Sequence, residues 1–441
     1  MQLLENVRQA FSVPELRARI KFVFAMFAVF ALGAHIPIPG LNVSGLQGQL
    51  DGGVLGMLDL FTGGSMKRMS LFALGIMPYI TASIIMQLMG VAFPQVEQWQ
   101  KEGEWGRRKI AQWTRYLTVA AAALQGFGLL SLFRSAGVLP DAAVLTKLRV
   151  VITMVAGTAF LLWLSEQITQ KGIGNGVSLI IFAGIMLRLP QQLTQMFKLA
   201  GQDAGYLFSF VVLIAFLVAT VYGVIYVQQA QRRIPVQYTR RGGGSRMTGA
   251  SSYLPIQVNT AGVIPIIFAI AVAMFPAQIM QMVPVPRIAE VFGFDIQEWW
   301  GGASVWAQTF FSPTSSAFAL AFYFLLVIAF TYFYTMIMYK PDDVADNLRK
   351  SGGLIPGIRP GGPTASYLDH VITRITLGGA LFLGCIAIIE FVVPRFNKVG
   401  QGIQFDLMGG TSVLIVVMVA LETMKQIESQ LLVRQYDSFI R

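Results

Sequence analysis

Ionisable side chains within the long apolar runs are the residues of this sequence that could do chemistry in a nonpolar setting. They lie at the ends of these runs rather than at the centres: Glu166, Arg188, Arg374, Glu390, Asp406 and Glu422. Transport coupled to protons or ions needs ionisable groups at mid-depth in a membrane. The run centres instead carry Ser, Thr, Gln and Asn, whose ordinary role is hydrogen bonding between helices. The pattern therefore disfavours coupled transport.

Residues typical of catalysis or metal binding are sparse. His35 and His370 lie far apart in the sequence, and Cys385 is the only cysteine, so no disulfide can form within the chain. We find no histidine or cysteine spacing typical of a metal site, no nucleophile elbow and no phosphate-binding loop. We therefore expect no enzymatic activity, no metal site and no cofactor.

Arginine side chains gather in a long polar connection, residues 228–257, which contains no Asp or Glu. Its cations are Arg232, Arg233, Arg240, Arg241 and Arg246. Guanidinium groups bind phosphates through paired hydrogen bonds, which indicates contact with RNA or anionic lipid. An ordinary topology signal that also attracts lipid headgroups is the alternative.

A second large connection, residues 340–370, contains a cluster of Pro and Gly around Arg359. Such residues favour a tight, exposed turn. A rigid tip that presents an arginine suits a protein-docking surface, although a plain turn has the same composition.

The composition indicates where these segments lie. The chain has 441 residues, of which 55% are hydrophobic and 12% are charged, and its mean hydropathy is +0.61. Soluble domains carry about 25% charged residues. Long apolar runs in place of short alternating segments predict an all-α polytopic membrane protein and not a barrel. The first run begins near Phe22 and has no small-residue cleavage site, so we interpret it as a retained span.

Ten apolar runs are long enough to be candidate spans. They fall near residues 20–38, 69–93, 116–133, 149–168, 173–189, 206–227, 258–283, 315–339, 371–393 and 405–424. Connections on one side carry 22 Lys and Arg against 10 on the other, which places both termini in the cytoplasm. Ten spans also divide into two halves of five, whose membrane orientations would be inverted.

The stretch "VLGMLDLFTGGSMKRMSLF", residues 54–72, contains an apolar stub between the first two spans. At helical rise its apolar part would extend only ~13 Å, far short of a bilayer core of ~30 Å. Gly63 and Gly64 end it and permit a sharp reversal of the chain. The stub is apolar enough to pack inside protein, and an amphipathic turn on the surface is the alternative.

Several motifs together resemble the SecY family, whose members form protein-conducting channels. They are "IPIPG" at 36–40, "FALGIMPYITASIIMQL" at 72–88, "KEGEWGRRKIAQWTRY" at 101–116, "EQITQKGIGNGVSLIIFAGI" at 166–185, "VNTAGVIPIIFA" at 258–269, "ADNLRKSGGLIPGIRPG" at 345–361 and "GGTSVLIVVMVALE" at 409–422. They occur in order along nearly the whole chain. The external connection around "FGFDIQEWWGGASVW" carries little of the resemblance.

The resemblance implies ten transmembrane helices in two inverted five-helix halves around a central pore. The segments would be a cytoplasmic N-terminus at 1–21, a first half at 22–190, a second half at 191–424 with cytoplasmic loops at 228–257 and 340–370, and a cytoplasmic tail at 425–441. Such a channel passes unfolded polypeptides across the bacterial plasma membrane. It also opens sideways to release apolar segments into the lipid bilayer.

The resemblance also implies functional residues. The stub would form a plug at about 55–64, comprising Leu55, Met57, Leu58, Leu60, Phe61, Gly63 and Gly64. A pore ring would comprise Ile76, Ile80, Val177, Ile181, Ile267 and Ile415. Aliphatic side chains at a constriction disfavour a continuous water column and make no sequence-specific hydrogen bonds to a passing chain.

A lateral gate would separate the second and third spans from the seventh and eighth, with Thr81, Gln87 and Asn259 near the seam. Arg240, Arg241, Arg246 and Arg359 would dock the ribosome and the motor ATPase SecA. The implied partners also include the small membrane subunits SecE and SecG, signal peptides and unfolded substrate chains.

Two other functions compete with a protein-conducting channel. An inverted-repeat secondary transporter of small solutes would need a mid-membrane binding site with ionisable groups, which the sequence lacks. An insertase-like scaffold would lack a continuous aqueous path. The behaviour of the six aliphatic positions distinguishes a channel from both.

Overall fold

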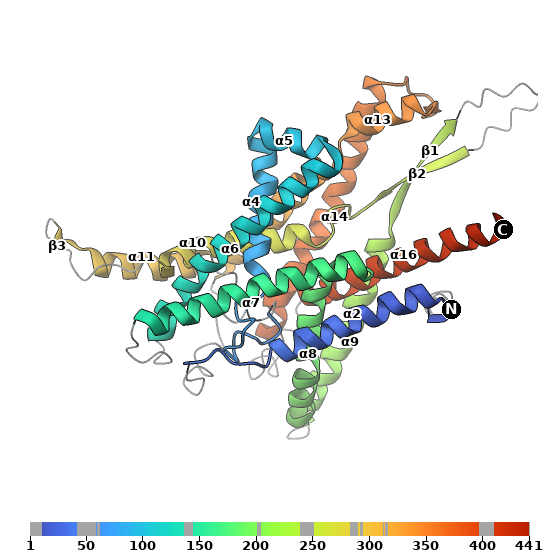
Figure 1. Ribbon diagram of the computed structural model, residues 1–441. Coiled ribbons are helices and arrows are strands. Elements are labelled where there is room, and N and C mark those ends of the chain that lie inside the picture. The colour runs from blue at the N-terminus through green and yellow to red at the C-terminus, as the bar shows by residue number, and fades with distance from the viewer. Residues whose placement is uncertain are drawn as a thin grey trace, which may run out of the picture.

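The computed structural model describes residues 11–41, 59, 62–135, 144–200, 204–238, 251–282, 290–291, 294–311, 313, 316–396 and 410–440. These residues are mostly helical, and the long helices cross one another in one bundle (Figure 1). The helical architecture expected from the composition is confirmed.

The helices, in chain order, are α2 (Pro14–Gly33), α4 (Met77–Ala92), α5 (Pro94–Lys101), α6 (Gly103–Ser135), α7 (Val144–Lys171), α8 (Gly176–Ala200), α9 (Ala204–Gln229), α10 (Ile264–Met282), α11 (Ile296–Phe311), α12 (Ala317–Met338), α13 (Pro341–Lys350), α14 (Gly362–Phe396) and α16 (Gly410–Ile440). Each predicted span overlaps one of the longer helices. Within the described residues, six helices are long and apolar enough to cross a membrane, and α4 with α5 forms a further pair bent by 102°. The apolar part of α10, Ile264–Ala273, is shorter. The total of ten spans therefore remains a prediction.

Prolines explain where the first two helices depart from the predicted spans. The residue before a proline disfavours helical backbone, and α2 ends at Gly33, ahead of Pro37. Proline is tolerated in the first turn of a helix, and α4 accordingly begins at Met77, with Pro78 in that turn. The predicted span at 20–38 thus extends past the end of α2, which itself begins earlier at Pro14, and the predicted span at 69–93 begins well before α4. In contrast, α8 continues through Pro190 to Ala200, past the predicted boundary between halves at 190.

A small sheet joins the two large polar connections, which were predicted from the sequence to be loops. Strands β1 (Gln231–Tyr238) and β2 (Ser251–Gln257) pair antiparallel, and β5 (Gly353–Leu354) pairs with the end of β1. Ile234 and Val236 of β1 alternate inward and pack on Leu348, Leu368 and other apolar residues. A short second hairpin, β3 (Glu290–Val291) and β4 (Phe294–Asp295), precedes α11.

The largest hydrophobic core lies at the centre of the bundle. It draws residues from α2, α4, α7, α8, α9, α10, α12, α14 and α16, so both predicted halves contribute to it. A separate small core packs Leu16 of α2 against Ile427 and Leu431 of α16. The start of α2 and the end of α16 consequently lie on the same side of the bundle, the side toward which β1 and β2 extend (Figure 1).

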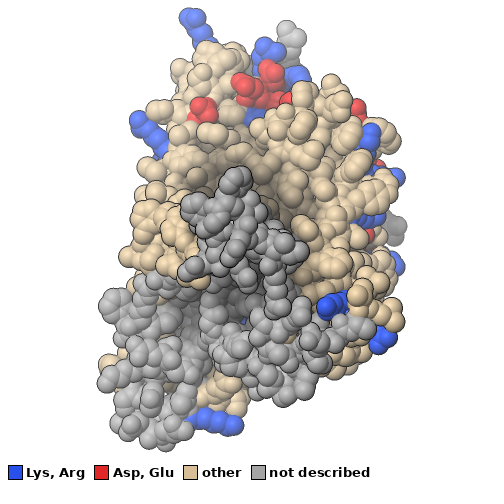
Figure 2. All heavy atoms as spheres, turned by 90° about the vertical axis from the view of Figure 1, so that its left-hand side faces the viewer, with Lys and Arg blue, Asp and Glu red and all other residues tan. Residues whose placement is uncertain are grey.

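Charged side chains are unevenly distributed over the surface. On the face drawn in Figure 2, Lys, Arg, Asp and Glu lie mainly toward its margins, and most of the described surface between them carries other residues. Exposed charge in lipid is costly, so a described surface with few charged residues is compatible with contact with hydrocarbon.

Candidate functional site

Six aliphatic side chains from four regions of the chain meet in the central core. Ile76 immediately precedes α4, and the other five belong to helices: Ile80 to α4, Val177 and Ile181 to α8, Ile267 to α10 and Ile415 to α16. The five isoleucines are buried, and Val177 is partly buried against the same core. The structure therefore brings the six predicted ring residues into one cluster.

A cavity of about 250 Å³ adjoins this cluster. Five of the six residues line it, the exception being Ile76. The other lining residues include polar, aromatic and aliphatic side chains: Tyr79, Ser83, Gln87, Asn175, Ser178, Val263, Ile264, Phe268 and Val419. The side chains of isoleucine and valine carry no hydrogen-bonding atoms, so the five ring residues at the wall can contact an extended chain without recognising its sequence.

The chain between α2 and α4 folds back into the protein. We refer to residues 59–70 as the foldback segment, of which the structure describes Asp59 and residues 62–70. Thr62, Ser65, Met66 and Met69 are all buried. The predicted plug residues Leu55, Met57, Leu58, Leu60 and Phe61 lie outside the described residues.

Two predicted plug residues, Gly63 and Gly64, are described and adopt the left-handed backbone conformation, with φ of 70° and 82°. A Cβ at Gly63 would lie 2.9 Å from the Cα of Gly184 on α8. Gly63 thus allows both the reversal of the chain and its close approach to α8.

The remainder of the foldback segment is fixed by backbone pairing. The amide of Ile38 donates to the carbonyl of Met69 at 2.7 Å, and the amide of Leu71 donates to the carbonyl of Ile36 at 2.8 Å. This short antiparallel contact ties the end of the segment to the stretch that follows α2.

The helices on either side of the predicted gate are in contact. Helix α10 packs against α6 and α4, which belong to one side of the predicted gate, and also against α12. Phe268 of α10 lies edge-on to Phe330 and Tyr334 of α12, with ring centroids 6.1 and 6.2 Å apart. The α10–α12 pair is thus bound by aromatic packing.

The three polar residues assigned to this gate make local hydrogen bonds. Thr81 donates to the carbonyl of Met77, and Gln87 donates to the hydroxyl of Ser83, both within α4. Asn259 bonds the backbone of Gly262 in both directions. These bonds do not join one helix to another, because each side chain reaches a nearer partner in its own segment.

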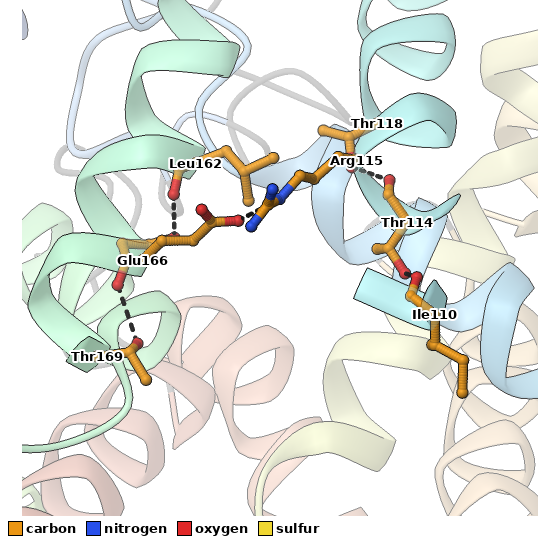
Figure 3. A network of polar contacts seen from close by, with 8 residues as sticks. Ile110, Thr114, Arg115, Thr118, Leu162, Glu166 and Thr169 are labelled. Atoms are coloured by element: carbon orange, nitrogen blue, oxygen red, sulfur yellow. Dashed lines mark hydrogen bonds and ion pairs between the residues drawn. The ribbon is translucent and has the colours of Figure 1, made fainter. Parts of the chain in front are cut away.

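An ion pair that was not predicted from the sequence links α6 to α7. The Nε of Arg115 donates to Oε1 of Glu166 at 2.6 Å, across the space between the two helices (Figure 3). Thr114 and Thr118 bond carbonyls of α6, and Thr169 bonds a carbonyl of α7, so these hydroxyls turn to their own helices (Figure 3). In the sequence, the only indication of this ion pair was a single acidic residue, Glu166, at the end of an apolar run.

Charges on α5 interact with those at the α12–α13 junction. Lys101 donates a hydrogen bond to Glu97 at 2.8 Å, which lowers the pKa of the carboxyl, and Glu97 in turn raises the pKa of Lys101. Lys340 and Asp343 reinforce these two shifts. The favourable pairing is present at neutral pH and is lost as the pH falls through the lowered carboxyl pKa or rises through the raised ammonium pKa.

The predicted docking arginines fall on the β1–β2 connection and on the tip after β5. Arg240, Arg241 and Arg246 lie outside the described residues. Arg359 is exposed, and its carbonyl accepts from the hydroxyl of Thr364 at 2.8 Å. Gly357 and Gly361 flank it with positive φ, so the turn that presents Arg359 depends on glycine.

Acidic, histidine and cysteine side chains do not gather in any cluster of three or more within the described part of the chain. Cys385 is exposed there and is not part of a disulfide.

Comparison with known proteins gives a consistent picture. The SecY family profile matches residues 70–424. "Protein translocase subunit SecY" of Streptomyces scabiei is 43% identical over 455 residues, and that of Halalkalibacterium halodurans is 44% identical over 448 residues, each match covering 100% of both chains.

Solved structures resemble the fold at lower sequence identity. One, described as "The structure of a protein conducting channel", has a TM-score of 0.64 at 17% identity and covers 96% of each chain. "Sec61 in the Canine ribosome-channel complex from the endoplasmic reticulum" has a TM-score of 0.61 at 17% identity, again with 96% of each chain covered. The sequence similarity extends over the whole chain, and the structural likeness supports the same fold.

Proposed function

Because this chain belongs to the SecY family of protein translocase subunits, we propose that its central cavity is the constriction of a protein-conducting channel. The chain is a multi-pass membrane protein that translocates polypeptide, and a small-solute transporter is not favoured. The proposal concerns which residues carry out this function.

The observation that carries the proposal is the meeting of Ile80, Val177, Ile181, Ile267 and Ile415 at the wall of one cavity. They come from helices of both predicted halves, so movement of one half against the other would change the width between them. Ile76 supports this ring from the start of α4. Aliphatic side chains at a narrow point exclude a continuous water column and hence limit ion leak.

We assign the apolar stub together with the front of the foldback segment, about Leu55–Gly64, to a plug that covers the constriction in the resting channel. The burial of Thr62, Ser65 and Met66 and the close approach of Gly63 to α8 support this assignment. A solved neighbour of this fold is described as "The plug domain of the SecY protein stablizes the closed state of the translocation channel and maintains a membrane seal".

The contact of α10 with α4 and α6 supports a lateral gate at this seam, with Thr81, Gln87 and Asn259 beside it. Since these side chains bond within their own segments, opening would separate helices held by packing. Release of an apolar signal segment would then exchange protein contacts for contacts with lipid.

We assign ribosome docking to Arg240, Arg241 and Arg246 and SecA docking to Arg359. One solved neighbour is described as a Sec61 ribosome–channel complex and another as an idle yeast Ssh1 complex bound to the yeast 80S ribosome. The paired strands β1 and β5 support a joint docking platform, because they place both loops on one sheet. SecE and SecG would complete the complex in the bacterial plasma membrane, with both chain termini in the cytoplasm.

The test of the constriction compares neighbouring isoleucines that differ in whether they line the cavity. Ile181→Asn and Ile267→Asn place an amide at the cavity wall and are expected to raise the ion conductance of the resting channel in planar bilayers. Ile180→Asn and Ile266→Asn are matched controls, because both residues are buried in the same core but do not line the cavity.

An amide buried without a partner costs about 1–3 kcal/mol, so all four variants lose some stability. Raised ion conductance in Ile181→Asn and Ile267→Asn, but not in the two control variants, would support the assignment of the cavity as the constriction. Equal conductance in all four variants, with translocation unchanged, would overturn it.

A further inference from the structure

A fully buried carboxylate organises the foldback segment. The Oδ1 atom of Asp59 accepts hydrogen bonds from the amides of Met66 at 3.0 Å and Lys67 at 3.1 Å. It also lies 3.3 Å from the hydroxyl of Thr62, which donates to it. One oxygen of Asp59 therefore holds the tight turn of the segment together.

The other oxygen of this carboxylate faces a cation on a different helix. Oδ2 of Asp59 lies 3.3 Å from Nη2 of Arg188 on α8, and the side chains are 0% and 12% exposed. A carboxylate taken out of water is unfavourable unless a cation or hydrogen bonds compensate it. The position of the segment is thus coupled to the position of Arg188.

Helix α8 contacts the segment along one face. Gly184, Arg188 and Gln191 are spaced i, i+4 and i+7, which places them on the same side of the helix. Gly184 meets the backbone of Gly63, and Gln191 accepts a hydrogen bond from Nη2 of Arg68 at 3.1 Å. The segment thus rests on α8 through one charge pair and one backbone contact near its front, at Asp59 and Gly63, and through one polar contact near its later end, at Arg68.

The two ends of the segment are held differently. Its later end is fixed to the stretch after α2 by the backbone bonds of Ile38 and Leu71, and by Arg68, whose Nη1 lies 2.9 Å from Nε2 of His35. Its front end, around Asp59, has the ion pair with α8. If the ion pair at the front end breaks while the later end stays attached, the segment would rotate about its later end and move away from α8.

We propose that the Asp59–Arg188 ion pair is the latch that holds the foldback segment against α8 in the resting channel. Asp59 and Arg188 are then positioning residues, and their significance for conduction depends on the proposed role of the segment as a plug. A charge pair is strong when it is dry and weak when water solvates both partners. Once a passing chain admits water, the latch weakens further, and the open position becomes self-sustaining.

The test measures the position of the segment directly. Ser65 is 0% exposed in the closed structure, and Cys385 is the only natural cysteine. In a Cys385→Ser background, Ser65→Cys supplies a single thiol whose reaction with a membrane-impermeant maleimide reports release of the segment. The full chain is purified with its small subunits and reconstituted in vesicles, and the reagent is added to each side in turn.

Asp59→Asn keeps an oxygen for the amides of Met66 and Lys67 but removes the charge, and Arg188→Met removes the cation. Each is expected to speed the labelling about 10- to 100-fold, the equivalent of losing one hydrogen bond to a charged group. Arg188→Lys keeps the charge and is expected to stay within about twofold of the parent. Unchanged labelling in both Asp59→Asn and Arg188→Met overturns the latch.

A double variant separates a latch from two independent effects. Asp59→Asn combined with Arg188→Met has no unpaired charge, so its acceleration should be smaller than the product of the two single accelerations. A result equal to that product overturns the proposed pairing. If Arg188→Met does not accumulate in the membrane, Asp59→Asn and Arg188→Lys still decide the outcome.

Conductance of the same variants distinguishes the latch from the proposed function. Ile267→Asn should leak without faster labelling of Ser65→Cys, because it alters the constriction and not the segment. Faster labelling of Asp59→Asn with no added leak would support the latch and contradict the plug. Faster labelling of Asp59→Asn together with an increased ion leak would support both the latch and the plug.

Discussion

Aliphatic residues at the central cavity and charged residues around it have different functions. Ile181 and Ile267 contribute bulk without hydrogen-bonding atoms, so they can close a pore yet retain no particular substrate. Asp59 and Arg188 form an ion pair with each other across the foldback contact. Arg359, by contrast, is exposed on a turn and is free to meet another protein.

At the residue scale, Arg359→Glu is expected to lower motor-driven translocation at least about tenfold while ribosome binding persists, because like charges facing each other across an interface cost several kcal/mol. Translocation into vesicles with SecA and ATP measures the first effect, and cosedimentation with ribosomes measures the second.

Lys350→Glu is the matched control, since Lys350 is also an exposed cation in the same connection but lies at the end of α13. An equal loss in both variants would show that general charge, and not Arg359, determines docking.

At the element scale, the foldback segment depends on glycine, on backbone pairing and on α8. Left-handed backbone lets Gly63 and Gly64 reverse the chain, and the absence of a side chain at Gly63 lets the segment touch Gly184. The segment is therefore positioned by the surface of α8, while the bonds of Ile38 and Leu71 provide its anchor.

Substitution of Gly63 and of Gly64 by alanine should distinguish the effect of backbone strain on the foldback segment from the effect of its close packing against α8. Gly63→Ala adds left-handed strain of about 1–2 kcal/mol and also a methyl group 2.9 Å from Gly184. Gly64→Ala adds the same strain, but its nearest neighbour is the Arg188 side chain at 3.7 Å. Labelling of Ser65→Cys should therefore be faster in Gly63→Ala than in Gly64→Ala. The reverse order would show that contact with α8 does not position the segment.

At the scale of the whole molecule, the bundle places a cavity at the meeting of both predicted halves and a small sheet on the side where α2 begins and α16 ends. The sheet joins two polar connections that are far apart in the chain. Docking at this sheet would therefore act on the segments that lead into α10 and α14.

The basic connection between β1 and β2 gives a prediction about the complete assembly. Arg240→Glu with Arg241→Glu should weaken ribosome binding most at low salt and reduce the slope of log affinity against log salt by about 2, since each arginine neutralises one phosphate. Titration of ribosomes at several salt concentrations measures this slope.

Arg232→Glu with Arg233→Glu, on the exposed start of β1, is the matched control for position. An affinity that is unchanged by the Arg240 and Arg241 substitutions at every salt concentration would contradict the RNA contact.

Composition and residue order determined that this chain is a helical membrane protein, because long apolar runs with few charges leave hydrogen-bonded helices as the stable form in lipid. The glycine pair also indicated the reversal of the apolar stub, since few other residues tolerate left-handed backbone. The apolar runs, however, did not give the ends of α2 and α4, which lie near Pro37 and Pro78, and the alternation of Ile234 and Val236 was too short to identify β1.

Only the tertiary structure decided which of the many apolar side chains line the cavity, because Ile180 and Ile181 are equally apolar and differ in the direction they face. The pairings of Asp59 with Arg188 and of Arg115 with Glu166 likewise required the packing of helices, since a charge in the sequence does not specify its partner. Hydrophobicity acts on every apolar residue alike, whereas a pore wall and a charge pair depend on direction and distance.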